Sequence, residues 1–442
     1  MTDVWRNWSG DQRCSPARLR RPANVAEVRA AVGEATDAGE VVRVVGAGHS
    51  FNDIVSTPGT LLDIAAMDRL LDVDPGKGLV RVEAGITIRA LGPQLARHGL
   101  AMANLGDIDS QSIAGAISTG THGTGAHLGN ISSQVVALQL VTAGGDTVEI
   151  TDSDGETLRA ARVSLGALGV ITAVTLQCVP LFVVRRRAGS VPLEEILDDF
   201  PERAAQHDRL EFFVFPYADK ALVKITDTVA QRASPLPSWK RYLEDVVLEN
   251  RAFDLACQVG RRFPTAIPAI NRVSTAVAGS GERLDYGYRV FATRRDVRFT
   301  EMEYAIPLQH AARAVRAAMA LVQRERLPVN FPLEVRCATD DDAFLSPAYG
   351  RPTCHISVHT FSGMDFRRYF REVETIMEGM GGRPHWGKRH SQTADSLESR
   401  YPRWHAFQAV RRRLDPAGRF SNQHIERVLG PVDQRKAIPS PR

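Results

Sequence analysis

The feature that most constrains the fold of this chain is a glycine-rich loop directly after a short buried strand. Residues 41–45 (Val-Val-Arg-Val-Val) are expected to form the strand, and Gly46-Ala47-Gly48-His49-Ser50 follows at once. Two glycines after a strand are typical of a dinucleotide-binding turn, but that turn needs a third glycine and a helix directly afterwards. Phe51 stands where the third glycine would be, and residues 51–59 supply no helix. Two interpretations are left: ordinary turn glycines, or a loop whose bare N–H groups bind a pyrophosphate.

A second stretch, residues 104–125, is also built from small side chains. It contains Asn-Leu-Gly-Asp at 104–107 and Ser-Ile-Ala-Gly-Ala-Ile-Ser-Thr-Gly-Thr-His-Gly-Thr-Gly at 112–125. Side chains this small let the backbone approach a bound molecule closely. A lone histidine such as His49 is more often structural than functional. Its neighbours favour a functional role, because they bring backbone close to a ligand.

The length and the residue pattern predict two packed domains of mixed helices and strands. At 442 residues the chain exceeds the usual size of one domain. Asn24 and Glu27 match a capping box, which predicts a helix through about residue 38, and a second helix is expected from Thr87 to His98. Strands are expected at residues 61–64, 79–85 and 173–179 and within 135–151. We place the domain boundary near residues 180–190.

The second half alternates helices with strands that carry polar residues on one face. Residues 311–325 have the apolar spacing of a helix, and residues 329–336 and 353–361 alternate as strands do. Glu334 and Arg336 share a face of the first strand, and His355, Ser357 and His359 share a face of the second. Such a face is usually a solvated surface with cross-strand salt bridges. The alternative is a closed pocket, in which Arg336 stabilises negative charge and Glu334 holds a hydroxyl.

Residues 383–388, Arg-Pro-His-Trp-Gly-Lys, form a compact and unusual motif. Lys388 close to Trp386 is interpreted as a partly desolvated amine with a lowered pKa, suited to proton transfer. The alternative is a loop that starts a helix. Glu301 and Glu303 also alternate on a strand, but no third group joins them in the sequence, so they are expected to be structural.

Composition and charge exclude several classes of protein. A net charge of +4 and one short basic run, residues 185–187, do not indicate nucleic-acid binding. No apolar run reaches the ~18 residues of a membrane span, and the first residues do not resemble a secretory signal. The five cysteines are scattered and contain no Cys-x-x-Cys pair, so reduced, mostly buried thiols and no metal site are expected. We therefore expect a cytoplasmic protein.

Four motifs taken together resemble the sugar-1,4-lactone oxidoreductases of the vanillyl-alcohol oxidase flavoprotein family. They are Val-Gly-Ala-Gly-His-Ser at 45–50, Thr-Gly-Thr-His-Gly-Thr-Gly at 119–125, Glu-Val-Arg at 334–336 and His-Trp-Gly-Lys at 385–388. The resemblance covers nearly the whole chain, from about residue 15 to residue 430. Each motif alone is weak, but the four in this order are specific.

The resemblance implies a two-domain α+β architecture with an FAD-binding domain of the PCMH type. Residues 15–185 would form this FAD-binding domain. Residues 186–430 would form a substrate domain of the aldonolactone oxidase type, a cap built on an antiparallel sheet flanked by helices. Its C-terminal segment would return to the flavin. FAD is the implied cofactor, bonded covalently through His49 to the flavin 8α-methyl group.

The resemblance also implies which residues contact the cofactor and the substrate. Glu334, Arg336 and Lys388 match the substrate pocket, where Arg336 and Lys388 would stabilise the developing alkoxide while Glu334 orients the lactone hydroxyls. The residues expected to bind FAD are His49, Gly46, Ala47, Gly48, Ser50, Asn52, Gly106, Ser112, Ala114, Gly115, Ser118, Thr121, Gly123, Val170, Ile171 and His424.

The implied reaction is oxidation of an aldono-1,4-lactone by hydride transfer to flavin N5. L-gulono-1,4-lactone is the favoured substrate, and its product would rearrange to ascorbate; the alternative is an alditol oxidase that produces H2O2. A flavin enzyme of cell-wall synthesis, such as a decaprenyl-phosphoribose oxidase, agrees less well with the His49 loop and the 385–388 motif. The electron acceptor is O2 or a cytochrome or quinone. In this family a small residue beside flavin C4a gates oxygen, and here Ala114 carries an extra methyl group that would obstruct it.

Overall fold

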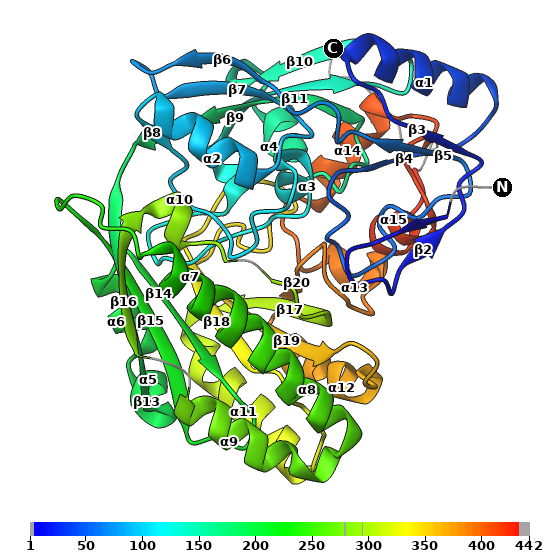
Figure 1. The fold of residues 1–442 in the computed structure, drawn as a ribbon. Coiled ribbons are helices and arrows are strands. Elements are labelled where there is room, and N and C mark those ends of the chain that lie inside the picture. The colour runs from blue at the N-terminus through cyan, green and yellow to red at the C-terminus, as the bar shows by residue number, and fades with distance from the viewer. Residues whose placement is uncertain (1–3, 278–279, 294, 433–442) are drawn as a thin grey trace.

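The computed structural model describes residues 4–277, 280–293 and 295–432, which form two parts (Figure 1). The main sheet of the first part has antiparallel neighbours in the order β10-β9-β11-β7-β6. Its strands are β6 (Leu70–Asp74), β7 (Leu79–Glu83), β9 (Val135–Val141), β10 (Thr147–Thr151) and β11 (Val170–Gln177). Helices α2 (Ile88–Arg97), α3 (Ile113–Ser118) and α4 (Glu156–Arg162) share one apolar core with this sheet.

A small parallel sheet, β3-β5-β4, carries the glycine loop. Its strands are β3 (Arg18–Arg20), β4 (Val42–Val45) and β5 (Thr60–Asp63), and α1 (Val25–Asp37) packs beside it. The Asn24 side chain accepts a hydrogen bond from the Glu27 N–H at 3.0 Å, so the predicted helix cap is confirmed. Because β4 ends at Val45, residues 46–50 leave the carboxyl end of the sheet.

The second part is built on an eight-stranded antiparallel sheet in the order β16-β13-β15-β14-β18-β19-β17-β20. Its strands are β13 (Val183–Pro192), β14 (Arg209–Val214), β15 (Lys220–Val229), β16 (Gly281–Tyr286), β17 (Phe299–Pro307), β18 (Leu333–Ala338), β19 (Thr353–Phe361) and β20 (Arg383–Pro384). The expected cap on an antiparallel sheet is therefore present.

One face of this sheet is apolar and packs on helices. Its core contains side chains of α5 (Leu193–Asp198), α6 (Phe200–Gln206), α11 (Ala311–Arg324) and α12 (Arg367–Glu378). The remaining helices of this part are α7 (Ser238–Tyr242), η3 (Leu243–Ala252), α8 (Phe253–Arg262), η4 (Pro264–Ala266), α9 (Ile267–Val277), α10 (Gly287–Val290) and η5 (Leu308–His310).

The other face of β17, β18 and β19 carries a row of polar side chains. Glu334 lies opposite Ser357 in the register, and Glu301 lies opposite His359. Since side chains alternate along a strand, Arg336 shares the face of Glu334. These residues are all buried, so the face is covered by protein and is not a wet surface.

The C-terminal helices return to the first part of the molecule. Figure 1 shows α13 (Ala394–Glu398), α14 (Trp404–Leu414) and α15 (Gln423–Leu429) beside the N-terminal strands. The Val42 N–H donates to the Arg419 carbonyl at 2.7 Å, and the Asn422 amide donates to the Ser56 carbonyl at 2.8 Å. The strand before the glycine loop and the residues after it are therefore both hydrogen-bonded to the C-terminal segment.

One local expectation and one alternative interpretation differ from the structure. The strand predicted at 329–336 begins only at Leu333, because Pro332 has no N–H for the ladder and the Asn330 amide instead donates to the Cys257 carbonyl at 3.1 Å. Residues 383–388 form β20 and a turn, and the next helix begins at Ala394.

The remaining elements are short. Two-stranded sheets pair β1 (Trp5–Arg6) with β2 (Arg13–Cys14) and β8 (Leu100–Ala101) with β12 (Val179–Pro180), and η1 (Ile131–Gln134) and η2 (Asp152–Asp154) are single turns. All five cysteines are free thiols and four of them are buried. Within the described residues, no helix combines the length and the apolar character that a bilayer crossing requires.

Candidate active site

A cleft of about 990 Å³, partly open to solvent, lies where the glycine loop, α3 and the turn at 385–388 meet. Its walls come from both parts of the molecule. The lining residues include Trp5, Val45, Gly46, Ala47, Gly48, His49, Ser50, Ile108, Gln111, Ser112, Ala114, Gly115, Ser118, Thr119, Gly169, Ile171, His385, Gly387 and Lys388.

The glycine loop and the start of α3 fit a phosphate-bearing cofactor. A Cβ atom added at Gly46 would lie only 1.9 Å from the Ser112 Oγ, so only glycine lets the loop approach the helix. Gly48 has a φ of +65°, a conformation that side chains disfavour. Ser112 caps α3 by accepting a hydrogen bond from the Gly115 N–H. Bare backbone N–H groups at such a loop favour an anion.

His49 lies on the wall of this cleft and stacks on Trp8. The two ring centroids are 4.6 Å apart and the planes differ by 20°. Burial, aided by the positive charge of Lys388, lowers the pKa of His49 to about 4. The imidazole is therefore neutral near pH 7, and one ring nitrogen keeps a free lone pair.

The structure divides the sixteen predicted cofactor residues into two groups. Those on the cleft wall are Gly46, Ala47, Gly48, His49, Ser50, Ser112, Ala114, Gly115, Ser118 and Ile171. Those away from it are Asn52, Gly106, Thr121, Gly123, Val170 and His424. The Asn52 amide donates to the carbonyls of Trp386 and Lys388, both at 2.8 Å, and so ties the glycine loop to the 385–388 turn.

The other five residues outside the wall have structural contacts. His424 is buried and its Nδ1 lies 2.8 Å from the Asp53 Oδ1, while Val170 belongs to the core against α1. A Cβ atom at Gly123 would lie 2.3 Å from both the Asn104 Oδ1 and the Leu105 carbonyl oxygen, so only glycine fits there. A Cβ atom at Gly106 would lie 3.2 Å from the His122 carbonyl and 3.4 Å from the Thr121 Cγ2.

Arg336 and Glu334 form the centre of a buried charged cluster on β18. The two side chains are ion-paired, and the Arg336 Nε also donates to the Glu211 Oε2 at 2.9 Å. Asp107, from the small-residue stretch, lies 3.4 Å from the same guanidinium. Burial and the nearby carboxylates raise the pKa of Glu334 to about 7, although the positive charge of Arg336 acts to lower it.

Lys388 lies at the other end of this polar face, on the cleft wall. Its ammonium pairs with the Glu301 carboxylate on β17 and lies 4.9 Å from the centre of the Phe51 ring. The His359 Nε2 lies 3.6 Å from the other oxygen of Glu301. Although burial alone would raise the pKa of Glu301, Lys388 and His359 lower it to about 2.

The expectation of a lowered pKa at Lys388 is wrong. Burial does lower it, but the carboxylates of Glu301 and Glu303 outweigh burial and raise the pKa of Lys388 above its usual value. Trp386 is fully buried and donates to the Leu345 carbonyl at 2.6 Å. Lys388 is thus a permanent cation beside the cleft.

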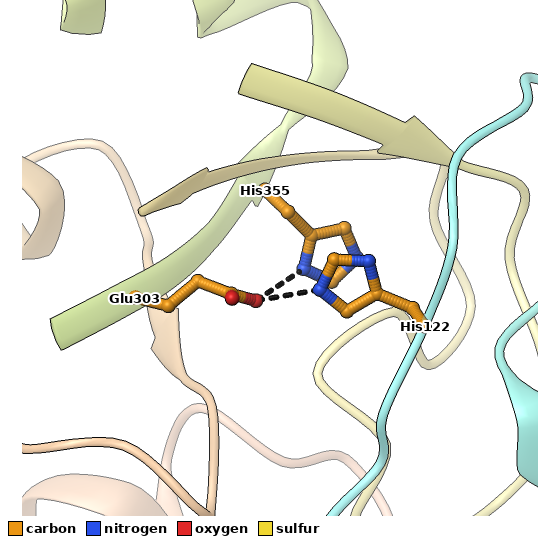
Figure 2. A group of neighbouring side chains, drawn as sticks. All are labelled: His122, Glu303 and His355. Atoms are coloured by element: carbon orange, nitrogen blue, oxygen red, sulfur yellow. Dashed lines mark hydrogen bonds and ion pairs between the residues drawn. The ribbon is translucent and has the colours of Figure 1, made fainter. Parts of the chain in front are cut away.

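Glu303 joins a second cluster, with His122 and His355 (Figure 2). The His122 Nε2 lies 2.6 Å from the Glu303 Oε1, and the His355 Nδ1 lies 3.3 Å from the same oxygen. The His122 Nδ1 is 2.8 Å from the Gly123 carbonyl, which only accepts, so Nδ1 carries a proton. A further proton must then lie between Nε2 and Glu303. The expectation that Glu301 and Glu303 lack partners is therefore wrong.

A His–Glu–His set is also a set of zinc ligands, but its geometry here favours proton sharing. The three donor atoms lie within 4.8 Å of one another. The His122 and His355 rings, however, stack face to face with centroids 3.5 Å apart and planes 19° apart. In-plane lone pairs on parallel rings do not converge on one ion.

Sequence reasoning missed Glu301, Glu303, His122, Asp107 and Glu211 as members of the site. A usable signal was present for the first two, because two carboxylates at i and i+2 fit the face of a neighbouring strand that carries two histidines. No local signal marked Asp107 or Glu211, since their partner Arg336 is more than a hundred residues away.

Comparison with known proteins gives the family. A family model described as D-arabinono-1,4-lactone oxidase matches residues 174–428, and a model described as FAD binding domain matches residues 16–151. The chain belongs to the D-arabinono-1,4-lactone oxidase family. The predicted resemblance to sugar-1,4-lactone oxidoreductases is thereby confirmed, and members of this family with an FAD-binding domain are flavin-dependent oxidoreductases.

Full-length relatives agree with this family. The chain is 50% identical over 431 residues to an L-gulono-1,4-lactone dehydrogenase of Mycobacterium tuberculosis, covering 98% of this chain and 100% of the relative. It is 34% identical to an L-gulonolactone oxidase of Bos taurus (96% and 98% covered) and 30% identical to an alditol oxidase of a Streptomyces species (97% and 100% covered).

The fold of this family member agrees with that of a solved cholesterol oxidase. A solvent-stable cholesterol oxidase superposes with a TM-score of 0.81 at 19% identity, covering 96% of each chain. At this identity the likeness concerns the fold alone. It confirms the predicted two-domain α+β architecture with a PCMH-type FAD-binding domain.

Proposed function

We propose that this chain oxidises a ring CH–OH group of an aldono-1,4-lactone, with L-gulono-1,4-lactone as the favoured substrate and ascorbate, after rearrangement, as the product. One observation carries the proposal. A cleft suited to a flavin has on its wall the neutral imidazole of His49 and the buried cation Lys388, and Lys388 pairs with Glu301 on the polar face that also carries Glu334 and Arg336. The names of the full-length relatives support the lactone.

FAD would be held by the glycine loop, the start of α3 and β11, with the cap supplied by the second part of the chain. We assign residues 15–185 to FAD binding and residues 186–430 to the substrate. The loop at 46–50 and Ser112 line the cleft together, and a loop with two glycines suits a pyrophosphate because its backbone can approach the anion closely. When bound, FAD accepts the hydride that leaves the carbinol carbon.

The chain's own residues position the substrate and stabilise charge. Loss of the hydroxyl proton places negative charge on the substrate oxygen, and Lys388 and Arg336 are the buried cations that would stabilise it. The Glu334 carboxyl is suited to hold or exchange a proton near neutral pH, since its pKa is about 7. Gln111 and His385 also reach the cleft wall and would contact the lactone edge.

We propose that the flavin is bonded covalently to a ring nitrogen of His49. Support comes from the neutral state of the ring, because only an unprotonated nitrogen can form the bond to a methyl carbon. For the electron acceptor, we propose a cytochrome or quinone rather than O2, since the Ala114 methyl group lies on the cleft wall. The reduced thiols fit a cytoplasmic location.

A parallel assay tests the substrate class. We expect the purified yellow enzyme to reduce an artificial electron acceptor with L-gulono-1,4-lactone at a much higher kcat/KM than with xylitol. The alditol oxidase among the relatives makes a linear polyol the second candidate. A higher kcat/KM for xylitol, with H2O2 as a product, would replace the lactone by a polyol. A colourless protein that binds no FAD would contradict both.

A further inference from the structure

The exposed large hydrophobic side chains of this protein gather on one helical segment. Eight of the ten in the described residues lie between 239 and 273, and only Val4 and Leu71 lie elsewhere. The eight are Trp239, Tyr242, Leu243, Leu248, Leu255, Val259, Phe263 and Val273. Single exposed apolar residues are ordinary, but a concentration of this kind marks an interaction surface.

The geometry turns these side chains outward together. Helices α7, η3 and α8 follow one another without a break and lie on the outside of the second part of the molecule (Figure 1). Leu255 and Val259, four residues apart on α8, share one helix face, and Leu255 is 63% exposed. The opposite face holds the buried Cys257 and Gly260. The exposed side of an ordinary surface helix is polar, whereas here it is largely apolar.

The basic side chains of the segment lie on its exposed side. Lys240, Arg241, Arg251, Arg262 and Arg272 are exposed, and none has an ion-pair partner within the described residues.

Two acidic side chains of the segment, Glu244 and Asp245, face the protein. Both pair with Arg283 on β16, the Glu244 contact being 3.0 Å, and both are partly buried. The neutralised acids thus lie inward, and the outward face keeps an excess of unpaired positive charge next to apolar groups.

We propose that this surface, residues 238–273, docks onto an anionic phospholipid bilayer. Leu, Val and Phe side chains enter the acyl boundary, Trp239 and Tyr242 lie at headgroup level, and the lysine and arginines bind lipid phosphates. Such a helix lies on the bilayer without crossing it, in keeping with the absence of a spanning helix among the described residues.

A second copy of the chain fits this surface less well. A two-fold pair presents the same patch from both sides, so the unpaired arginines of one copy would meet those of the other. Glu244 and Asp245 are used by Arg283, which leaves Asp254, held by Gln258, as the one acid of α8 against the five unpaired cations. Lipid headgroups supply the missing negative charge.

Vesicle cosedimentation of the full flavin-containing enzyme tests the proposal. We expect binding to vesicles of phosphatidylcholine mixed with phosphatidylglycerol, little binding to phosphatidylcholine alone, and release by high salt. Each basic residue contributes about fivefold to such binding, so the double variant Arg251→Gln/Arg262→Gln should weaken it about 25-fold. Leu255→Ser/Val259→Ser should also abolish most of it.

Matched variants elsewhere keep the test specific. Leu71→Ser on β6 and Arg313→Gln on α11 change one exposed apolar and one exposed basic residue outside this surface, and both variants should bind vesicles as the unchanged enzyme does. Thermal melts confirm that every variant is folded. Enzyme that stays in the supernatant with anionic vesicles overturns the proposal. A second result would also overturn it. In this result, sedimentation velocity shows that the unchanged enzyme is a dimer and that Leu255→Ser/Val259→Ser is a monomer, while vesicle binding is the same for both.

Discussion

The ammonium of Lys388 is paired with the carboxylate of Glu301, which lies 87 residues earlier in the chain on strand β17. The pair is buried on the side of the cleft that faces the second part of the molecule. It fixes a full positive charge at the cleft wall, because the two Glu residues of β17 outweigh the burial of the amine.

Removing this partner should move the alkaline limb of the pH profile. In the unchanged enzyme the raised pKa of Lys388 keeps the amine charged at all ordinary pH values. In Glu301→Gln burial dominates, so Lys388 loses its proton at lower pH and kcat/KM falls earlier on the alkaline side. Glu149→Gln, which removes an exposed ion pair with Arg81, is the control. Profiles of the Glu301 variant and the control that superimpose would contradict this role.

Ionisation of Glu334 should produce the acidic limb of the pH profile of kcat/KM. With its pKa raised to about 7 by burial, the carboxyl is protonated below that pH and ionised above it. We expect kcat/KM to rise with pH through about 7 and then level off. Glu334→Gln should lose about a hundredfold in kcat/KM and show no limb there. The exposed Glu202→Gln on α6 should keep the limb, and a limb that persists in Glu334→Gln would assign it to another group.

The bond to His49 has a direct optical test. After acid precipitation, the pellet of the unchanged enzyme should fluoresce under ultraviolet light, because the flavin stays attached to the chain. His49→Ala should bind flavin that is released into the acid supernatant, while the exposed His98→Ala should resemble the unchanged enzyme. A dark pellet from unchanged, yellow enzyme would show that the cofactor is not covalent.

Gly46 should tolerate no side chain. In Gly46→Ala the new methyl group overlaps Ser112, so the loop must move, with an expected loss of about 1–3 kcal/mol of stability and of most bound flavin. Gly33→Ala in the middle of α1 meets no atom within 4 Å and should instead stabilise the protein by about 1 kcal/mol. Melting temperatures and the ratio of flavin to protein absorbance measure both effects. Equal behaviour of the two variants would refute the close approach.

Ala114 should control access of oxygen. Enzyme reduced by the lactone without air and then mixed with air-saturated buffer should reoxidise slowly, and Ala114→Gly should do so many times faster. Ala116→Gly makes the same change on the same helix at a residue that does not line the cleft, and it should leave the rate unchanged. Reoxidation of the unchanged enzyme within a second would rule out an obstructed flavin.

The sequence predicted local features of this protein well. The cap at Asn24, the helix after Thr87 and the alternation of 353–361 are read from neighbouring residues, and all three are confirmed. It failed where a side chain depends on a distant partner. The sequence predicts a lowered pKa for Lys388 from desolvation, because no neighbour in the sequence indicates its partner Glu301. Glu303 contacts His122 only because the two parts of the molecule pack together.

The return of the C-terminal segment to β4 has a consequence for synthesis on the ribosome. Arg43 is fully enclosed and donates to the carbonyls of Phe420 and Leu165, while Val42 bonds to Arg419. The strand that precedes the glycine loop therefore acquires its last partners only after residue 420 has emerged from the exit tunnel. A nascent chain stalled before that point therefore holds an unfinished cofactor cradle.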